Sequence, residues 1–144
     1  SPGLRETVDT PEILKRKGID YVCDWVIDDR PAWMNTTEGA LIAMPYNLEV
    51  NDSIIYAIER HATGEMARRL EFTLRRFETE CRDSAIVLAI GLHPHLISVP
   101  HRIHELERML DLLTASPDAG FFTGSQLADW YAAVEAAPDA TRAL

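Results

Sequence analysis

Hydrophobic residues follow two different spacings along this chain. Apolar runs of strand length occur at 19–27, 40–44 and 85–92, with a brief one at 120–123. Between them, apolar residues recur every three or four positions, as on a helix with one buried face, and predict helices at 10–17, within 51–82, at 101–114 and at 125–136. The polar stretch 28–39 is expected to be a loop. Alternating strands and helices predict an α/β fold with a parallel sheet.

Individual residues indicate where the helices begin and end. Thr10 offers a side-chain cap, and Pro11 suits a first helical turn, so a helix is expected to begin at Thr10 and to end before Gly18. The polar residues at 51–53 offer caps for the long helical region that follows, and Gly64 divides that region into two helices.

The segment SAIVLAIGLHPH, residues 84–95, places two histidines directly after an apolar run. The run, 85–90, is typical of a strand buried on both faces, and reactive groups of α/β proteins lie at the carboxyl ends of such strands. His93 therefore stands where an active-site histidine would, and with a partner on its other nitrogen it could serve as general acid or base. The alternative is that His93 only caps the strand end. His95 is a further candidate, or simply exposed.

Asp24 and Trp25 interrupt the apolar run YVCDWV. A buried carboxylate is costly unless it is paired, and an aspartate facing a histidine is a common way to orient an imidazole and raise its basicity. Asp24 is thus a candidate partner of His93, and Trp25 a candidate pocket wall. In the alternative interpretation, Asp24 points outward and Trp25 is a core residue.

Further polar residues and histidines are candidates for substrate or metal binding. Tyr46 and Asn47 follow the run 40–44 and suit hydrogen bonding to a substrate, or they only shape the loop. His101 and His104 have a spacing that can hold a metal, but no third ligand is near, so we interpret them as surface residues. No phosphate-binding glycine loop, Gly-x-Ser-x-Gly elbow or Cys-x-x-Cys pair is present.

Composition narrows the function classes. A chain of 144 residues that is 47% hydrophobic and 26% charged can form one domain with a sizeable core. The net charge of −9 argues against nucleic acid as a partner, and the arginines near residues 68–76 alternate with glutamates as on a solvated helix face. Because no stretch reaches the length of a membrane span and no secretory signal opens the chain, we expect a cytoplasmic protein without a membrane partner.

Three segments in chain order resemble the C-terminal half of the polysaccharide deacetylase superfamily (carbohydrate esterase family 4 and its relatives). Ser1-Pro2-Gly3 is similar to an Arg-x-Pro-x-Gly motif whose arginine would precede the chain, Asp24-Trp25 to an Asp-Trp motif, and Gly91-Leu92-His93 to an apolar strand ending in histidine. The segment IAMPYNLEVND at 42–52, the stretch GLHPHLISVPHRI at 91–103 and the helical insertion 51–82 are similar to the allantoinase and cyclic-imidase branch.

The resemblance implies an irregular (β/α)7 barrel of which residues 1–144 supply the parallel-sheet C-terminal half of a single catalytic domain. The family's first two motifs carry an aspartate base and, in metal-dependent members, an Asp-His-His set for a divalent metal such as zinc. Neither motif is found here, so we expect no metal ligand in this chain and no activity from it alone. The expected partners are the missing N-terminal segment of the same barrel, a second copy in a homo-oligomer, and a small-molecule substrate.

The function implied by this branch is hydrolysis of a carbon–nitrogen bond in a cyclic amide, imide or ureide. His93 would donate a proton or stabilise the oxyanion, oriented by Asp24. The expected substrate contacts are Trp25, Tyr46, Asn47, His95 and Pro2. Two alternatives remain open: a metal-dependent sugar N-deacetylase on the same scaffold, and a non-catalytic ligand-binding domain.

Overall fold

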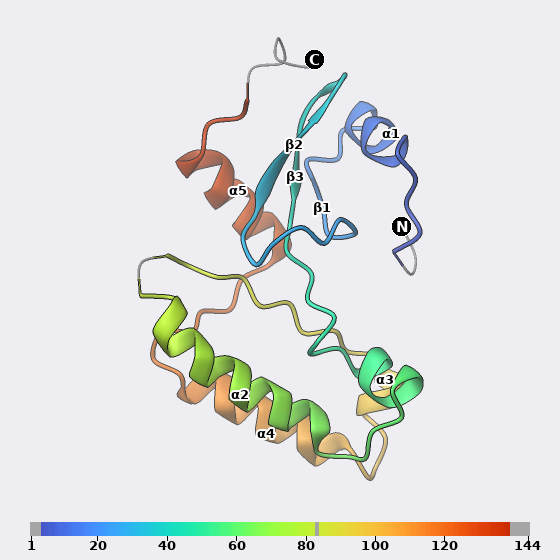
Figure 1. The fold of residues 1–144 in the computed structure, drawn as a ribbon, viewed down its shortest axis with the longest axis vertical. Coiled ribbons are helices and arrows are strands. Elements are labelled where there is room, and N and C mark those ends of the chain that lie inside the picture. Colours follow the sequence, from blue (N-terminus) through green and yellow to red (C-terminus); the bar gives the residue numbers. More distant parts are fainter. Residues whose placement is uncertain (1–3, 83, 139–144) are drawn as a thin grey trace. The chain divides into compact units, whose positions relative to one another are not determined.

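The structure, a computed structural model, describes residues 4–82 and 84–138. It divides the chain into two units (Figure 1): the first comprises residues up to 46 and from 122 onward, and the second comprises 47–121. Each unit has its own hydrophobic cluster. We describe each unit by itself.

The first unit begins with helix α1, Thr10–Arg16. Pro11 lies in its first turn and is buried, and the helix ends before Gly18, whose φ of +80° few other residues adopt readily. The predicted helix is therefore confirmed. The N-cap position, however, is occupied by Asp9 and not by Thr10 as predicted, because the Thr10 backbone is already helical.

A small mixed sheet follows, formed by β1 (Tyr21–Val22), β2 (Ala32–Thr36) and β3 (Gly39–Ala43) in the order β1-β3-β2. β1 pairs with β3 in parallel, but β2 and β3 form an antiparallel hairpin. The prediction of a purely parallel sheet is thus wrong for the described residues. The cause lies in the segment 28–39, which was expected to be a loop. Its residues Ala32–Thr36 form β2, and a two-residue turn at 37–38, followed by Gly39 with φ of +115°, folds β2 back on β3.

Helix α5, Gly124–Val134, completes the first unit. Thr123 and Gln126 form a capping box at its start, and its buried Ala128 packs on Ile42 of β3 and on Met44, which follows that strand. The helix predicted at 125–136 is confirmed, whereas the brief strand predicted at 120–123 does not form in the described part of the chain.

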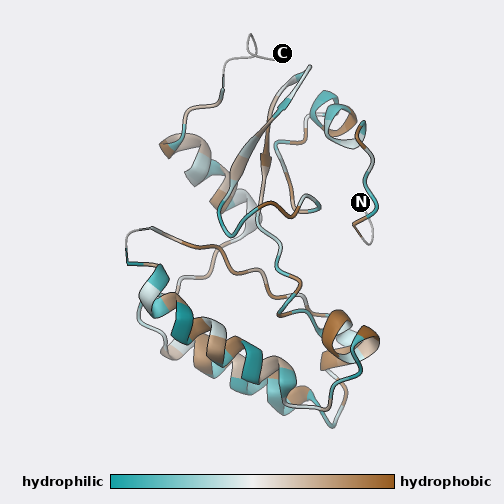
Figure 2. Cartoon of the chain, viewed as in Figure 1, coloured by the Kyte–Doolittle hydropathy of each residue, from teal (hydrophilic) through white to brown (hydrophobic). Residues whose placement is uncertain are grey.

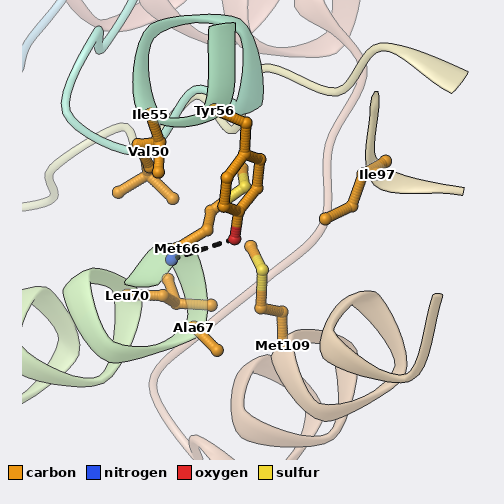
Figure 3. Packing of buried hydrophobic residues seen from close by; sticks show 8 residues of the cluster. All are labelled: Val50, Ile55, Tyr56, Met66, Ala67, Leu70, Ile97 and Met109. Carbon is orange, nitrogen blue, oxygen red and sulfur yellow. Dashed lines mark hydrogen bonds between the residues drawn. The ribbon is translucent and has the colours of Figure 1, made fainter. Parts of the chain in front are cut away.

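The second unit is helical. It contains the π-helix η1 (Ser53–Ile58), α2 (Glu65–Glu80), the short α3 (Pro94–Ile97) and α4 (Ile103–Ala115). Gly64, with φ of +106°, separates η1 from α2 as predicted. Their apolar faces meet in one core (Figure 3), whose buried members are Val50, Ile55, Tyr56, Met66, Ala67, Leu70, Ile97 and Met109.

The outer face of α2 carries the alternating charges seen in the sequence, and Figure 2 shows hydrophilic and hydrophobic positions side by side along this helix. Glu65 pairs with Arg68 at 2.8 Å and with Arg69 at 2.9 Å, and Arg75 pairs with Glu71 at 2.5 Å. The interpretation of this arginine cluster as a solvated helix face is confirmed. No helix in the described ranges is long and apolar enough to cross a membrane.

The apolar run before His93 does not form the central strand that was predicted. Residues 86–90 are half-buried, and the segment makes one isolated parallel bridge, between Gly91 and Asn51. Gly91 N donates to Val50 O at 3.0 Å, and Asp52 N donates to Gly91 O at 3.1 Å. A strand needs a neighbour that stays extended beside it. In parallel register with the bridge, residues 88–90 would lie beside 48–50, and those residues form a turn, so the pairing does not extend back along the run.

Candidate active site

His93 is held at two points by one carboxylate. Its ring nitrogen Nδ1 lies 2.6 Å from Oδ1 of Asp52, and its backbone N–H donates to Oδ2 of Asp52 at 2.6 Å. Asp52 is fully buried, whereas 41% of the His93 side chain is exposed. The carboxylate therefore fixes both the backbone and the ring of a histidine that solvent and ligands can reach.

This arrangement determines which ring nitrogen is available for chemistry. An ionised carboxylate only accepts hydrogen bonds, so we assign the proton to His93 Nδ1. The second ring nitrogen, Nε2, lies on the opposite edge of the ring from Asp52. Nε2 is therefore the atom that can give a proton to a bound molecule or take one from it. The two charge-assisted bonds from His93 also compensate the burial of the Asp52 carboxylate.

The local sequence explains why Asp52 turns toward His93. The neighbouring Asn51 already caps η1, because its Oδ1 accepts from Ser53 N at 3.0 Å and from Ile54 N at 3.4 Å. Asp52 makes no side-chain cap, although its backbone is helical. Its carboxylate is thus left to bind His93, which the bridge at Gly91 brings beside it.

Gly91 is required by the close approach of two segments. A Cβ atom at this position would lie 2.3 Å from Nδ2 and 2.6 Å from Cγ of Asn51. Asn51 is buried and holds the start of η1, so it cannot move aside without loosening that element. The absent side chain at Gly91 therefore lets the segment that carries His93 lie against the segment that carries Asp52.

The carboxylate that was predicted to hold His93 was Asp24, but the structure has Asp52 at Nδ1. Sequence reasoning used 51–53 as helix caps, and 51–52 also as the end of the segment similar to the allantoinase branch, but it gave Asp52 no role at His93. The signal it missed is that capping a helix takes only one side chain. In an Asn-Asp pair whose asparagine caps the helix, the aspartate can bind another residue. Asp24 lies in the first unit, where it is half-buried, and its role toward His93 stays a prediction.

The other predicted site residues fall in different places. His95 is exposed on α3, and its ring lies edge-on to that of His93 at 5.9 Å between centroids. The side-chain oxygen of Asn47 accepts from Ala89 N at 2.7 Å and so ties the loop at 47 to the run before His93. Its predicted contact with a substrate stays a prediction.

Trp25 and Tyr46 are half-buried residues of the first unit, and their contacts with a substrate likewise stay predictions. Pro2 lies outside the described residues. No group of three or more His, Cys, Asp or Glu side chains that could hold a metal ion is found within 4–82 and 84–138, and His101 and His104 are both exposed. The described residues therefore do not fit a zinc site, and we derive no step through a metal.

No protein-family model matches this sequence, and no curated protein matches it. The solved structures that are similar to the chain include the following two. One is a probable polysaccharide deacetylase from Pseudomonas aeruginosa PAO1, with a TM-score of 0.81 and 25% identity over 91% of this chain and 45% of that one. The other is PuuE allantoinase, with a TM-score of 0.82 and 24% identity over the same shares of the two chains.

These likenesses define the class of fold. The chain has an α/β fold with a small mixed sheet, similar to part of a polysaccharide deacetylase and part of an allantoinase. It spans less than half the length of either neighbour. The seven-stranded barrel and the place of this chain in its C-terminal half stay predictions.

Proposed function

We propose that this chain contributes His93 to the active site of a hydrolase that opens a carbon–nitrogen bond in a cyclic amide, imide or ureide. The observation that carries the proposal is the His93–Asp52 pair, in which a buried carboxylate holds Nδ1 at 2.6 Å. The likeness in fold to an allantoinase and to a probable polysaccharide deacetylase supports a hydrolase, because both names denote hydrolytic enzymes.

In the proposed reaction, water adds to the carbonyl carbon of the substrate, and the carbon–nitrogen bond breaks as the tetrahedral intermediate collapses. His93 begins as an imidazolium and donates the Nε2 proton to the departing nitrogen, or its Nε2–H stabilises the oxyanion. Asp52 keeps the proton on Nδ1 throughout and stabilises the imidazolium. The products are a carboxylate and, on the departing nitrogen, an amine from a cyclic amide, a carboxamide from an imide or a ureido group from a ureide.

The base that activates the water is proposed to come from a further segment of the same barrel, since the chain covers 45% of each neighbouring structure. Asp24 and Trp25 are proposed as further residues of the active site, and His95, whose ring lies 5.9 Å from that of His93, is a proposed substrate contact. Tyr46 and Asn47 remain weaker candidates for substrate contact.

The second candidate is a sugar N-deacetylase, which the likeness to the Pseudomonas aeruginosa protein favours. The same histidine would protonate the departing amine and release acetate. Because such an enzyme would bring its metal ligands from elsewhere, metal dependence separates the two candidates.

The test is a hydrolysis assay of this chain together with the segment proposed to supply the base, on a panel of cyclic imides, cyclic ureides and N-acetylglucosamine oligomers, each with and without a chelator. His93→Ala is compared with His104→Ala, which changes an exposed histidine of α4. Ring opening that falls by about 100-fold or more in His93→Ala supports the proposal, since general acid catalysis contributes factors of that size. Acetate release that is sensitive to chelator selects the deacetylase, and equal turnover by His93→Ala and wild type overturns the role of His93.

A further inference from the structure

Two short elements carry the His93–Asp52 pair. Asp52 directly precedes η1, which has six residues, and His93 directly precedes α3, which has four. Helices this short are not stable by themselves, so tertiary contacts must set where each one lies. The geometry of the pair therefore depends on the backbone bridge at Gly91 and on the further contacts that fix η1 against α3.

Arg102 touches both elements. Its guanidinium carbon lies 4.3 Å from the centroid of the Tyr56 ring, which belongs to η1. Its Nη1 donates to Leu96 O at 3.1 Å, and Leu96 belongs to α3. A planar guanidinium can stack on an aromatic face and donate at its edge at the same time, which an ammonium cannot do.

Glu105 holds the same tyrosine from another side. The Tyr56 hydroxyl donates to Oε2 of Glu105 at 2.6 Å, and Oε1 of Glu105 accepts from Ala67 N, in the first turn of α2, at 3.0 Å. Burial, with help from the Glu105 bond, raises the pKa of Tyr56, so the hydroxyl stays a donor. Figure 3 shows the Tyr56 ring within the core of the unit, its oxygen directed toward Met66 N.

The Nε atom of Arg102 is buried and has no hydrogen-bond partner among the described residues. A buried donor without an acceptor is destabilising. The placement of this side chain is therefore poorly explained by stability alone. Its two contacts, on Tyr56 and on Leu96, instead join the two elements that carry the pair.

We infer that Arg102 is a positioning residue that clamps η1 to α3 and thereby sets the distance between the Asp52 carboxylate and the His93 ring. Tyr56 lies four residues after Asp52, and Leu96 lies three residues after His93. A shift of either element changes the hydrogen bond at Nδ1 before it disrupts the core. The inference concerns the geometry of the pair, and it rests on the proposed function only where turnover is measured.

The test compares Arg102→Gln with Arg108→Gln in the full 144-residue chain. Arg108 lies on the same helix and pairs with Glu71 at 3.0 Å on the surface, so it is a matched control. The readout is the side-chain NMR signal of the His93 ring, assigned with His93→Gln. We expect wild type and Arg108→Gln to show one tautomer with a protected Nδ1 proton. Arg102→Gln should lose that protected proton and populate both tautomers.

A folded Arg102→Gln protein with the wild-type His93 signal overturns the inference. If Arg102→Gln does not fold, as judged by circular dichroism, Arg102→Lys decides, because it keeps the charge but not the planar stack. Loss of the protected proton in Arg102→Lys supports the clamp, and an unchanged signal overturns it. Where ring opening is measurable, Arg102→Gln should lower kcat about tenfold with little change in KM. If the wild-type chain turns nothing over even together with the segment proposed to supply the base, the proposed function fails, while the NMR result still decides the inference.

Discussion

The two units of this chain hold their segments in different ways. In the first unit, β2 and β3 are joined by a backbone ladder from Ala32–Ala43 to Thr36–Gly39, and α5 packs on that sheet. In the second unit, the segment that leads to His93 has no ladder: one isolated backbone bridge holds it at Gly91, and the side chains of Asn47 and Asp52 hold it on either side of that bridge. A ladder survives most single substitutions because every residue supplies the same backbone groups, whereas a segment held by side chains depends on each of them.

The largest expected effect comes from Asp52→Ala. The change leaves the His93 backbone N–H and Nδ1 without their acceptor, and losing hydrogen bonds to a charged group should lower the free energy of unfolding by about 3 kcal/mol. Urea unfolding followed by circular dichroism measures it. Asp111→Ala, at an exposed aspartate of α4, is the control. Equal stability of the two variants would contradict the dependence of the site segment on the Asp52 side chain.

Gly91→Ala tests the close approach beside the site. A methyl group 2.3 Å from Asn51 Nδ2 must displace that side chain, and overpacking of this kind costs about 2 kcal/mol. The His93 ring signal should change as well. Gly18→Ala is the comparison in the first unit, where nothing lies within 4 Å and only the φ of +80° opposes the change. It should cost about 1 kcal/mol and leave the His93 signal as it is in wild type. Identical His93 signals in both variants would argue against the contact.

Thr123→Ala removes the cap of α5 in the first unit. Its hydroxyl accepts from Gln126 N, and loss of such a cap costs about 1 kcal/mol. Tryptophan fluorescence during unfolding measures the effect, because Trp25, Trp33 and Trp130 all belong to this unit. Thr114→Ala, on α4, serves as control. Thr123→Ala should leave the His93 signal as it is in wild type. A changed His93 signal would contradict the expectation that loss of this cap affects the first unit alone.

The smallest effect is expected at the solvent face of α2. Hydrogen bonds from Arg69 and then Arg68 lower the pKa of Glu65 below its ordinary value. The charged Glu65 therefore stabilises the folded state above its ordinary pKa, and this contribution is lost as the pH falls through the lowered value. Glu65→Gln should remove a few tenths of a kcal/mol near neutral pH, about the size of surface pairs, and less in acid. Urea unfolding at several pH values measures this loss of stability, with Glu78→Gln as control. A destabilisation by Glu65→Gln that grows as the pH falls would contradict the prediction.

The candidate site shows where sequence reasoning succeeded and where it stopped. His93 was singled out because it follows an apolar run, and the structure gives it a buried carboxylate at Nδ1. The partner was missed because Asp52 lies 41 residues away in the sequence and resembles a helix cap. The Asn-Asp pair is a local signal that one side chain remains after capping, but nothing local tells which residue the remaining carboxylate binds.

The sequence by itself determined the helices α1, α2, α4 and α5 and the break at Gly64. Helical hydrogen bonds and caps join residues a few positions apart, so their pattern is written locally. Only the tertiary structure decided that β2 turns back on β3, that the run before His93 stays unpaired along most of its length, and that Asp52 holds His93. Strand pairing and a bond between distant side chains depend on the path of the whole chain, which hydrophobic spacing does not encode.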